Sequence, residues 1–196
     1  MNINSAYNEK LASYYDLIFS GKDYLNESKF IKNLTVGKEV KRILDVGCGT
    51  GQHLSYLLDN EIEEIVGVDL SPHMIEKGLE RTQLDKRITL LNMDISEVEQ
   101  KDFDLAISMF NVVNHIQTLQ ELQGFFANIR KKIKKGGMFI FDVWNGVAAT
   151  RSLPKSGTRN IVGPIEKLAL KYKPEIDLMN SRVEMRNSVK VFYIDE

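Results

Sequence analysis

The segment at residues 43–51 constrains the fold of this chain more than any other feature. An apolar run, Ile43–Val46, is interrupted by Asp45 and continues into glycines at positions 47, 49 and 51. Glycine adopts positive φ angles without strain, and a loop without Cβ atoms can lie against a ligand at the start of a helix. We therefore expect a buried strand, a ligand-binding loop and a helix, which together open an α/β fold.

The spacing of these glycines separates two kinds of ligand. A dinucleotide-binding loop follows the pattern G-x-G-x-x-G, whereas the sixth position of this loop is Gln52. Asp45 stands just before the loop, where its carboxylate would repel a phosphate and accept hydrogen bonds from an ammonium group. The loop therefore favours a nucleoside that carries an amino-acid group, and a nicotinamide-dependent oxidoreductase is the weaker interpretation.

Three further segments agree with such a fold. Residues 65–68 lead to Asp69, residues 91–93 lead to Asp94, and residues 103–109 predict a fourth strand. An open parallel sheet binds its ligand outside the carboxyl ends of its strands, so these positions are expected to converge. The combination resembles the class I S-adenosylmethionine-dependent methyltransferases.

The resemblance implies a set of cofactor contacts. Asp69 matches the position that binds the two ribose hydroxyls, and Asp94 and Ile95 match those that meet the adenine ring. The end of the fourth strand would face the transferable methyl group. We expect S-adenosyl-L-methionine as the cofactor, without a metal ion. The residues expected to bind it are Asp45, Gly47, Cys48, Gly49, Gly51, Asp69, Leu70, Met74, Asp94, Ile95, Met109 and Tyr24.

The N-terminus and the residues after the fourth strand resemble a narrower group, the N-methyltransferases that act on nucleotide-linked amino sugars. In that group a tyrosine and a histidine at these places border the acceptor amine. Tyr15 and His115 are therefore the predicted catalytic residues, with His115 as a general base. Packing or capping of the following helix is an equal interpretation of His115, and the tyrosine spacing also fits core packing of amphipathic helices. His53 and His73 have no partner at metal-ligand spacing and are predicted to be surface or capping residues.

The composition agrees with a small-molecule acceptor. The chain has 26 basic and 27 acidic residues, so no bulk field would attract nucleic acid or an anionic membrane. Cys48 is the only cysteine, which excludes an internal disulfide and suits a cytoplasmic protein. We predict methyl transfer from S-adenosylmethionine to an N or O atom of a small molecule, with a nucleotide-linked amino sugar as the specific case. The alternative is a noncatalytic cofactor-binding or partner module.

Hydrophobic periodicity predicts five strands that alternate with helices. The strands are expected at residues 41–46, 64–69, 88–92, 104–109 and 138–144, and the helices at residues 52–60, 72–81 and 119–135. The crossover rule then gives a three-layer, Rossmann-like, doubly wound and mostly parallel sheet in the order 3-2-1-4-5. The fifth strand begins with the apolar run at residues 138–141 and is expected to be buried. Four lysines are expected in the last helical turn, before Gly136-Gly137: Lys131, Lys132, Lys134 and Lys135.

The chain is expected to be one methyltransferase domain, residues 1–196. Residues 1–40 would form a helical lid, residues 41–145 the cofactor-binding core, and residues 146–196 a substrate-side insertion with an antiparallel hairpin. The later strands of the resembled family are missing, so a truncated chain is expected. Such a chain would expose a sheet edge through which two copies could pair as a homodimer.

Overall fold

The structure is a computed structural model that describes residues 9–82, 85–145, 155–162, 166–177 and 182–193. The chain divides into two compact units, Met1–Val143 and Trp144–Glu196. The first unit holds the predicted lid and the predicted core. Among the described residues, no helix combines the length and the apolar character that crossing a bilayer requires.

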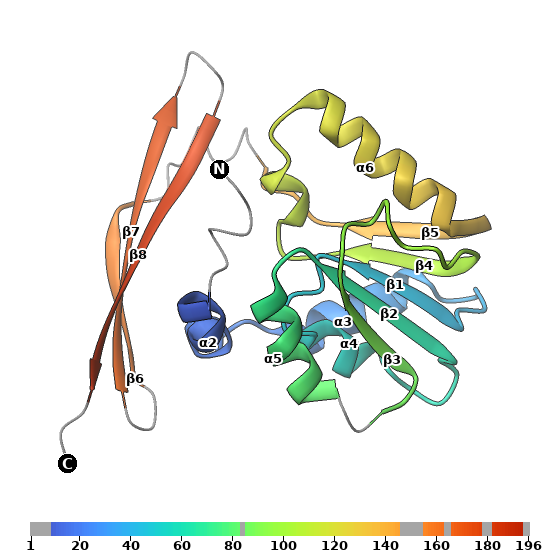
Figure 1. Cartoon of the computed structure of the whole chain (residues 1–196), viewed down its shortest axis with the longest axis horizontal. Coiled ribbons are helices and arrows are strands. Elements are labelled where there is room, and N and C mark those ends of the chain that lie inside the picture. Colours follow the sequence, from blue (N-terminus) through green and yellow to red (C-terminus); the bar gives the residue numbers. More distant parts are fainter. Residues whose placement is uncertain (1–8, 83–84, 146–154, 163–165, 178–181, 194–196) are drawn as a thin grey trace. The chain divides into compact units, whose positions relative to one another are not determined.

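The first unit is built around a five-stranded sheet in the order β3-β2-β1-β4-β5 (Figure 1). All four strand pairs are parallel, so the predicted order 3-2-1-4-5 is confirmed. The strands are β1 (Arg42–Val46), β2 (Glu64–Asp69), β3 (Ile88–Asn92), β4 (Phe103–Ser108) and β5 (Ile133–Phe141).

Helices connect and precede these strands, and several begin at side-chain caps. Asp23 accepts a hydrogen bond from the backbone of Asn26 at 3.0 Å, and Thr118 and Glu121 form a capping box. The helices are α2 (Glu9–Ile18), α3 (Tyr24–Leu34), α4 (Gln52–Leu57), α5 (Pro72–Thr82), the 3₁₀ turn η1 (Val112–His115) and α6 (Leu119–Lys132).

Two apolar clusters lie on the two faces of the sheet, because successive side chains of a strand point to opposite faces. Ile43 of β1 joins a cluster with residues of α3, α4 and α5, such as Leu54. Leu44, the next residue, joins a second cluster with Ile129 of α6. The three-layer arrangement follows from this alternation, and the carboxyl ends of β1, β2 and β4 stay free to face a ligand.

The structure corrects three boundaries and one burial prediction. Helix α4 ends at Leu57, and α6 ends at Lys132 because β5 starts at Ile133. Two of the four lysines, Lys134 and Lys135, therefore lie in a strand and not in a helical turn. Gly137 does not end the helix: a Cβ there would lie 2.9 Å from the carbonyl oxygen of Asp104, so its absence lets β5 approach β4. Strand β5 is half exposed and not buried, because it lies at the edge of the sheet.

The second unit contains a three-stranded antiparallel sheet in the order β6-β7-β8. Its strands are β6 (Gly157–Val162), β7 (Glu166–Asp177) and β8 (Arg182–Tyr193). Strands β7 and β8 form the predicted antiparallel hairpin, with Glu166 opposite Tyr193, and β6 adds a third strand. Part of the predicted insertion, residues 146–154, lies outside the described residues.

Candidate active site

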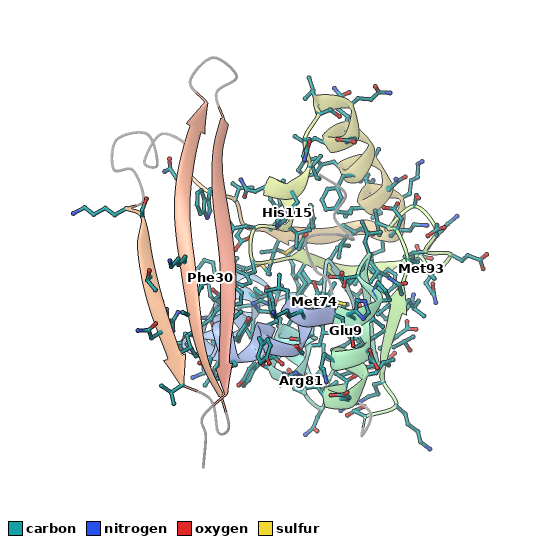
Figure 2. All side chains as sticks on the ribbon, turned by 60° about the vertical axis from the view of Figure 1, so that its left-hand side comes forward. Glu9, Phe30, Met74, Arg81, Met93 and His115 are labelled. Atoms are coloured by element: carbon teal, nitrogen blue, oxygen red, sulfur yellow. The ribbon has the colours of Figure 1, made fainter. Side chains whose placement is uncertain are left out.

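A cavity of about 560 Å³ lies at the carboxyl ends of β1, β2 and β4 in the first unit. This volume is within the usual range for small-molecule sites. Residues from separate elements converge on it, including Met74 of α5, Met93 after β3 and His115 of η1 (Figure 2). The sequence-predicted site residues that line it are Tyr15, Tyr24, Gly47, Cys48, Gly49, Asp69, Leu70, Met74, Asp94, Ile95, Met109 and His115.

The glycine loop forms one wall of the cavity. Gly47, Gly49 and Gly51 have φ angles of +78°, +54° and +70°, a region that disfavours residues with a Cβ. A Cβ at Gly47 would also lie 2.5 Å from a methyl carbon of Val112. Gly47 therefore allows both the turn and the close packing of η1 against the loop.

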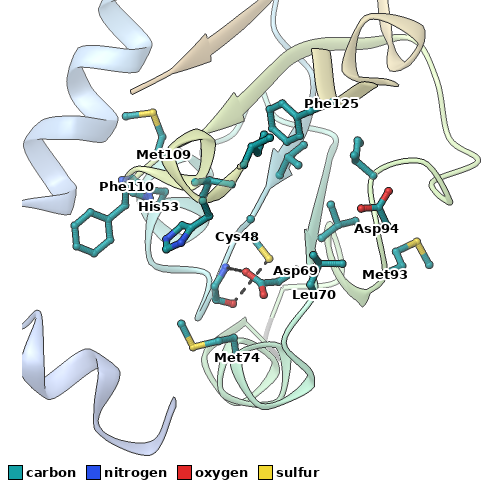
Figure 3. A pocket seen from close by; sticks show the side chains of 18 of the residues that line it. Cys48, His53, Asp69, Leu70, Met74, Met93, Asp94, Met109, Phe110 and Phe125 are labelled. Carbon is teal, nitrogen blue, oxygen red and sulfur yellow. Dashed lines mark hydrogen bonds between the residues drawn. The ribbon is translucent and has the colours of Figure 1, made fainter. Parts of the chain in front are cut away.

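Asp69 joins the glycine loop to the end of β2. Its carboxylate accepts hydrogen bonds from the backbone N–H of Gly49 at 2.9 Å, which Figure 3 shows, and from that of Ser71 at 2.8 Å. Burial raises the pKa of Asp69, although these two N–H groups oppose the rise. The carboxylate is held in place with lone pairs left for a ligand hydroxyl.

Two predicted cofactor residues, Asp45 and Gly51, lie outside the cavity lining. Asp45 is 2% exposed, and no described residue donates a hydrogen bond to its carboxylate. Burial, and next the negative charge of Asp69, raise the pKa of Asp45 to about 8. Asp45 is therefore a buried acid behind the glycine loop, where a positively charged ligand would favour its ionisation.

Cys48 lines the cavity as a small apolar group. It is buried, and burial raises the pKa of its thiol. A thiol of this kind is a poor nucleophile. A Cβ at Gly67 would lie only 2.9 Å from the Cys48 sulfur. The absence of a side chain at Gly67 therefore lets the two residues pack together.

Helix α2 is fastened to the glycine loop through Asp16. The Asp16 carboxylate accepts hydrogen bonds from the Thr50 hydroxyl at 2.7 Å and from the Gln52 amide at 3.1 Å, and it forms an ion pair with Arg81. Tyr15, next to Asp16, lines the cavity. The helix expected to be a lid thus contacts the ligand-binding loop directly.

Aromatic rings also line the cavity, among them those of Tyr24 and Phe110. The Phe110 ring lies 4.9 Å from that of Phe19 and 6.5 Å from that of Tyr24, in edge-to-face geometry. Burial and two nearby carboxylates, Asp16 and then Glu27, raise the pKa of Tyr24, so its hydroxyl stays protonated.

The backbone at the end of β4 has an unusual conformation that the sequence did not reveal. Phe110 and Asn111 have φ angles of +67° and +65°, which are uncommon for residues other than glycine. The carboxylate of Asp142, just after β5, accepts hydrogen bonds from both backbone N–H groups, at 3.0 and 2.6 Å. Asp142 also follows an apolar run, as Asp45 and Asp69 do, so this sequence pattern could have identified Asp142 as a residue of the site.

The prediction for His53 was wrong. His53 is 7% exposed and lines the cavity, and its Nε2 lies 2.8 Å from Oε2 of Glu27 in α3. Glu27 also forms an ion pair with Lys22. The partner comes from 26 residues earlier in the chain, so no local spacing could show it. His73, in α5, is half exposed and lies outside the cavity lining.

The two cavity histidines have different charged neighbours. Burial lowers the pKa of His115, while the negative charge of Asp69 opposes this. Burial also lowers the pKa of His53, while its hydrogen bond to Glu27 opposes it. Both imidazoles are therefore neutral near pH 7, and His115 faces the acid of β2 whereas His53 faces the acid of α3.

The residues present fit S-adenosylmethionine. The glycine cradle admits a ligand backbone, Asp69 offers a carboxylate to hydroxyl groups, and Asp94 and Ile95 line the far part of the cavity. A positively charged ligand would favour ionisation of the buried acid Asp45, whose pKa is raised to about 8. A dinucleotide is disfavoured, because the acids would face its diphosphate.

Known proteins agree with this geometry. The sequence pattern of a family described as a methyltransferase domain matches residues 43–137. A dTDP-3-amino-3,4,6-trideoxy-alpha-D-glucopyranose N,N-dimethyltransferase of Streptomyces venezuelae is 31% identical over 141 residues, covering 68% of this chain and 56% of that protein. The chain spans about half the length of the curated relatives it matches, 51%, 56% and 58% for three of them.

Solved structures share the fold. An S-adenosylmethionine-dependent methyltransferase from Clostridium acetobutylicum has a TM-score of 0.71 at 25% identity, covering 96% of this chain and 79% of that one. Streptomyces venezuelae DesVI has a TM-score of 0.72 at 22% identity, covering 92% of this chain and 82% of that one. The matched domain, the parallel strand order and the Clostridium structure support a class I S-adenosylmethionine-dependent methyltransferase.

Proposed function

We propose that this protein transfers a methyl group from S-adenosylmethionine to a small molecule, and that the acceptor atom is an amine nitrogen of a nucleotide-linked amino sugar. The observation that carries the proposal is the cavity itself, which is lined by Asp69, held by two backbone N–H groups, by the glycine loop and by aromatic rings. One side suits a charged nucleoside and the other suits an organic acceptor.

The residues of this chain would act mainly by alignment. S-adenosylmethionine, when bound, supplies a methyl group on a positively charged sulfur atom. Asp69 would hold the ribose hydroxyls, and Asp94 and Ile95 would meet the adenine. Tyr15 of α2 and Tyr24 of α3 would exclude water from the acceptor side.

The choice of an amino sugar is supported by the named relatives. Besides the Streptomyces venezuelae protein, a dTDP-4-amino-2,3,4,6-tetradeoxy-D-glucose N,N-dimethyltransferase of Saccharopolyspora spinosa is 27% identical over 152 residues. Both names specify a nucleotide-linked sugar with an amino group. An amine acceptor must lose a proton around the time of attack, so the site should hold a base.

The test is methyl transfer by the full chain to a panel of dTDP-linked amino sugars and their hydroxyl analogues, followed by mass spectrometry. We expect a mass gain of one or two methyl groups on an amino sugar and none on the analogue. Transfer to the hydroxyl analogue alone would overturn the nitrogen acceptor. Tight S-adenosylmethionine binding without transfer to any panel member would favour a noncatalytic cofactor-binding module.

A further inference from the structure

His53 has a carboxylate partner within hydrogen-bond distance. Its Nε2 lies 2.8 Å from Oε2 of Glu27. Lys22 also bonds to Glu27, through its other carboxylate oxygen, Oε1. The carboxylate is thus fixed from two sides, and it fixes the imidazole in turn.

The protonation of this pair follows from its contacts. Burial opposes ionisation of Glu27, but hydrogen bonds from Lys22 and His53 outweigh it and lower the pKa of Glu27. An ionised carboxylate can only accept a hydrogen bond, so Nε2 of His53 must carry the proton. In the neutral imidazole the lone pair is then on Nδ1.

The free nitrogen has access to the cavity. Of the buried side-chain N and O atoms in the described part of the chain, Ser28 Oγ alone lacks a hydrogen-bond partner. Nδ1 of His53 forms no hydrogen bond with a described residue, so it is not sealed in the protein. Because His53 lines the cavity, Nδ1 is reached from there.

The surroundings of His53 belong to the proposed acceptor side. The Tyr24 ring lies 5.0 Å from the imidazole, and Tyr24 also packs against Phe110 at the end of β4. The charged groups that act on His53 are Glu27 and Lys22 from the α3 side and Asp142 from the end of β5. The charge that acts on the pKa of His115 is instead that of Asp69, the acid assigned to the ribose.

We infer that His53, oriented by Glu27, is the catalytic base that takes the proton from the acceptor amine. This role rests on the proposed function. One N–H bond of the acceptor ammonium breaks, and its proton moves to Nδ1 of His53. The freed lone pair forms the N–C bond as the C–S bond breaks, and that electron pair stays on sulfur. The imidazolium then releases its proton to water. Glu27 is a positioning residue, since it acts through His53.

The test compares His53→Gln and Glu27→Gln with the matched control His73→Gln, which changes a half-exposed histidine of α5 outside the cavity lining. The acceptor is the amino sugar that the unsubstituted protein methylates fastest in the dTDP-sugar panel. We expect His53→Gln to lower kcat about 100-fold or more, the usual contribution of a general base. Binding of S-adenosylhomocysteine should stay within about twofold of the control, a difference far below one hydrogen bond.

The pH profile separates a base from a structural residue. In the unsubstituted protein, kcat should fall at low pH as the base becomes protonated, which is the acidic limb of the profile. This limb should be absent in His53→Gln. In Glu27→Gln the imidazole loses its carboxylate partner, so its pKa falls and the limb should move to lower pH. A limb that stays unchanged in Glu27→Gln, with His53 still present, would contradict the proposed coupling.

Nitrogen-15 NMR of the histidines, with S-adenosylhomocysteine added, gives a readout that needs no turnover. We expect His53 at pH 8 to be protonated on Nε2 and unprotonated on Nδ1. The opposite tautomer would overturn the role. Turnover that His53→Gln does not slow would also overturn it and leave the proposed function standing. If the unsubstituted protein methylates no member of the panel, the proposed function fails, and this role fails with it.

Discussion

The two sides of the cavity are built in different ways. The cofactor side comes from short contiguous segments, in which the glycine loop and Asp69 follow their strands directly. The acceptor side is assembled from distant parts of the chain: Glu27 reaches His53 across 26 residues, and Asp142 reaches Asn111 across 31. A local motif therefore reveals the first side, whereas only the folded chain reveals the second.

This difference predicts that substitutions on the two sides will change different measured quantities. Changes on the cofactor side should weaken S-adenosylhomocysteine binding, and changes on the acceptor side should slow turnover with little effect on that binding. Any variant that affects both quantities equally would show that the two sides are not independent.

On the cofactor side, the largest effect is expected for Asp69→Ala. The change removes the carboxylate that accepts hydrogen bonds from Gly49 and Ser71 and would leave the ribose hydroxyls without their acceptor. Loss of about 1–3 kcal/mol corresponds to a roughly 5–150-fold rise in the Kd of S-adenosylhomocysteine. Calorimetric titration measures it, with the exposed Glu99→Ala as control. An unchanged Kd would remove Asp69 from the ribose site.

A smaller effect is expected for His115→Gln, and it tests which histidine is the base. His115 lines the cavity near Asp69, so losing its contacts should cost about 1 kcal/mol and lower kcat by at most about tenfold. A larger loss of kcat than in His53→Gln, together with loss of the acidic limb, would instead make His115 the base that the sequence predicted. Steady-state kinetics on the same amino sugar decides between them.

Asp142→Ala should have a modest effect confined to the acceptor side. The backbone N–H groups of Phe110 and Asn111 would lose their acceptor while the two residues keep an unfavourable positive φ. The Phe110 ring would be held less well, and we expect kcat/KM to fall about fivefold, equivalent to one hydrogen bond. S-adenosylhomocysteine affinity should not change. A fall in that affinity alone would contradict the division of the cavity.

The smallest effect is expected for Asp45→Asn, as a pH-dependent gain in stability. The folded-state pKa of Asp45, about 8, lies above the unfolded value of about 3.9. The folded state therefore holds a proton that the unfolded state has lost, and stability falls as pH rises from about 4 to 8. Asparagine does not titrate, so the variant does not lose stability in this way as the pH rises. The difference in Tm between Asp45→Asn and the unsubstituted protein should be greater at pH 8.5 than at pH 5.5, by at least about 2–4 °C. A constant Tm difference would contradict the raised pKa.

Much of the core could be predicted because its signals are local. The strand at 88–92 and the strand at 64–69 match the structure residue for residue, since apolar runs and flanking turns define them. Gly136-Gly137 misled the prediction, because a glycine pair at a helix end and one where two strands approach closely look alike in sequence. The burial of His53 depends on how α3 packs against α4, and no pattern within either helix contains that information.

The account depends most on the claim that the strand-end acids and the glycine loop form a site for S-adenosylmethionine. Calorimetric titration of the unsubstituted full chain with S-adenosylmethionine and, separately, with NAD tests it directly. The account predicts saturable binding of one S-adenosylmethionine per chain and no measurable binding of NAD. Saturable NAD binding without S-adenosylmethionine binding would contradict it.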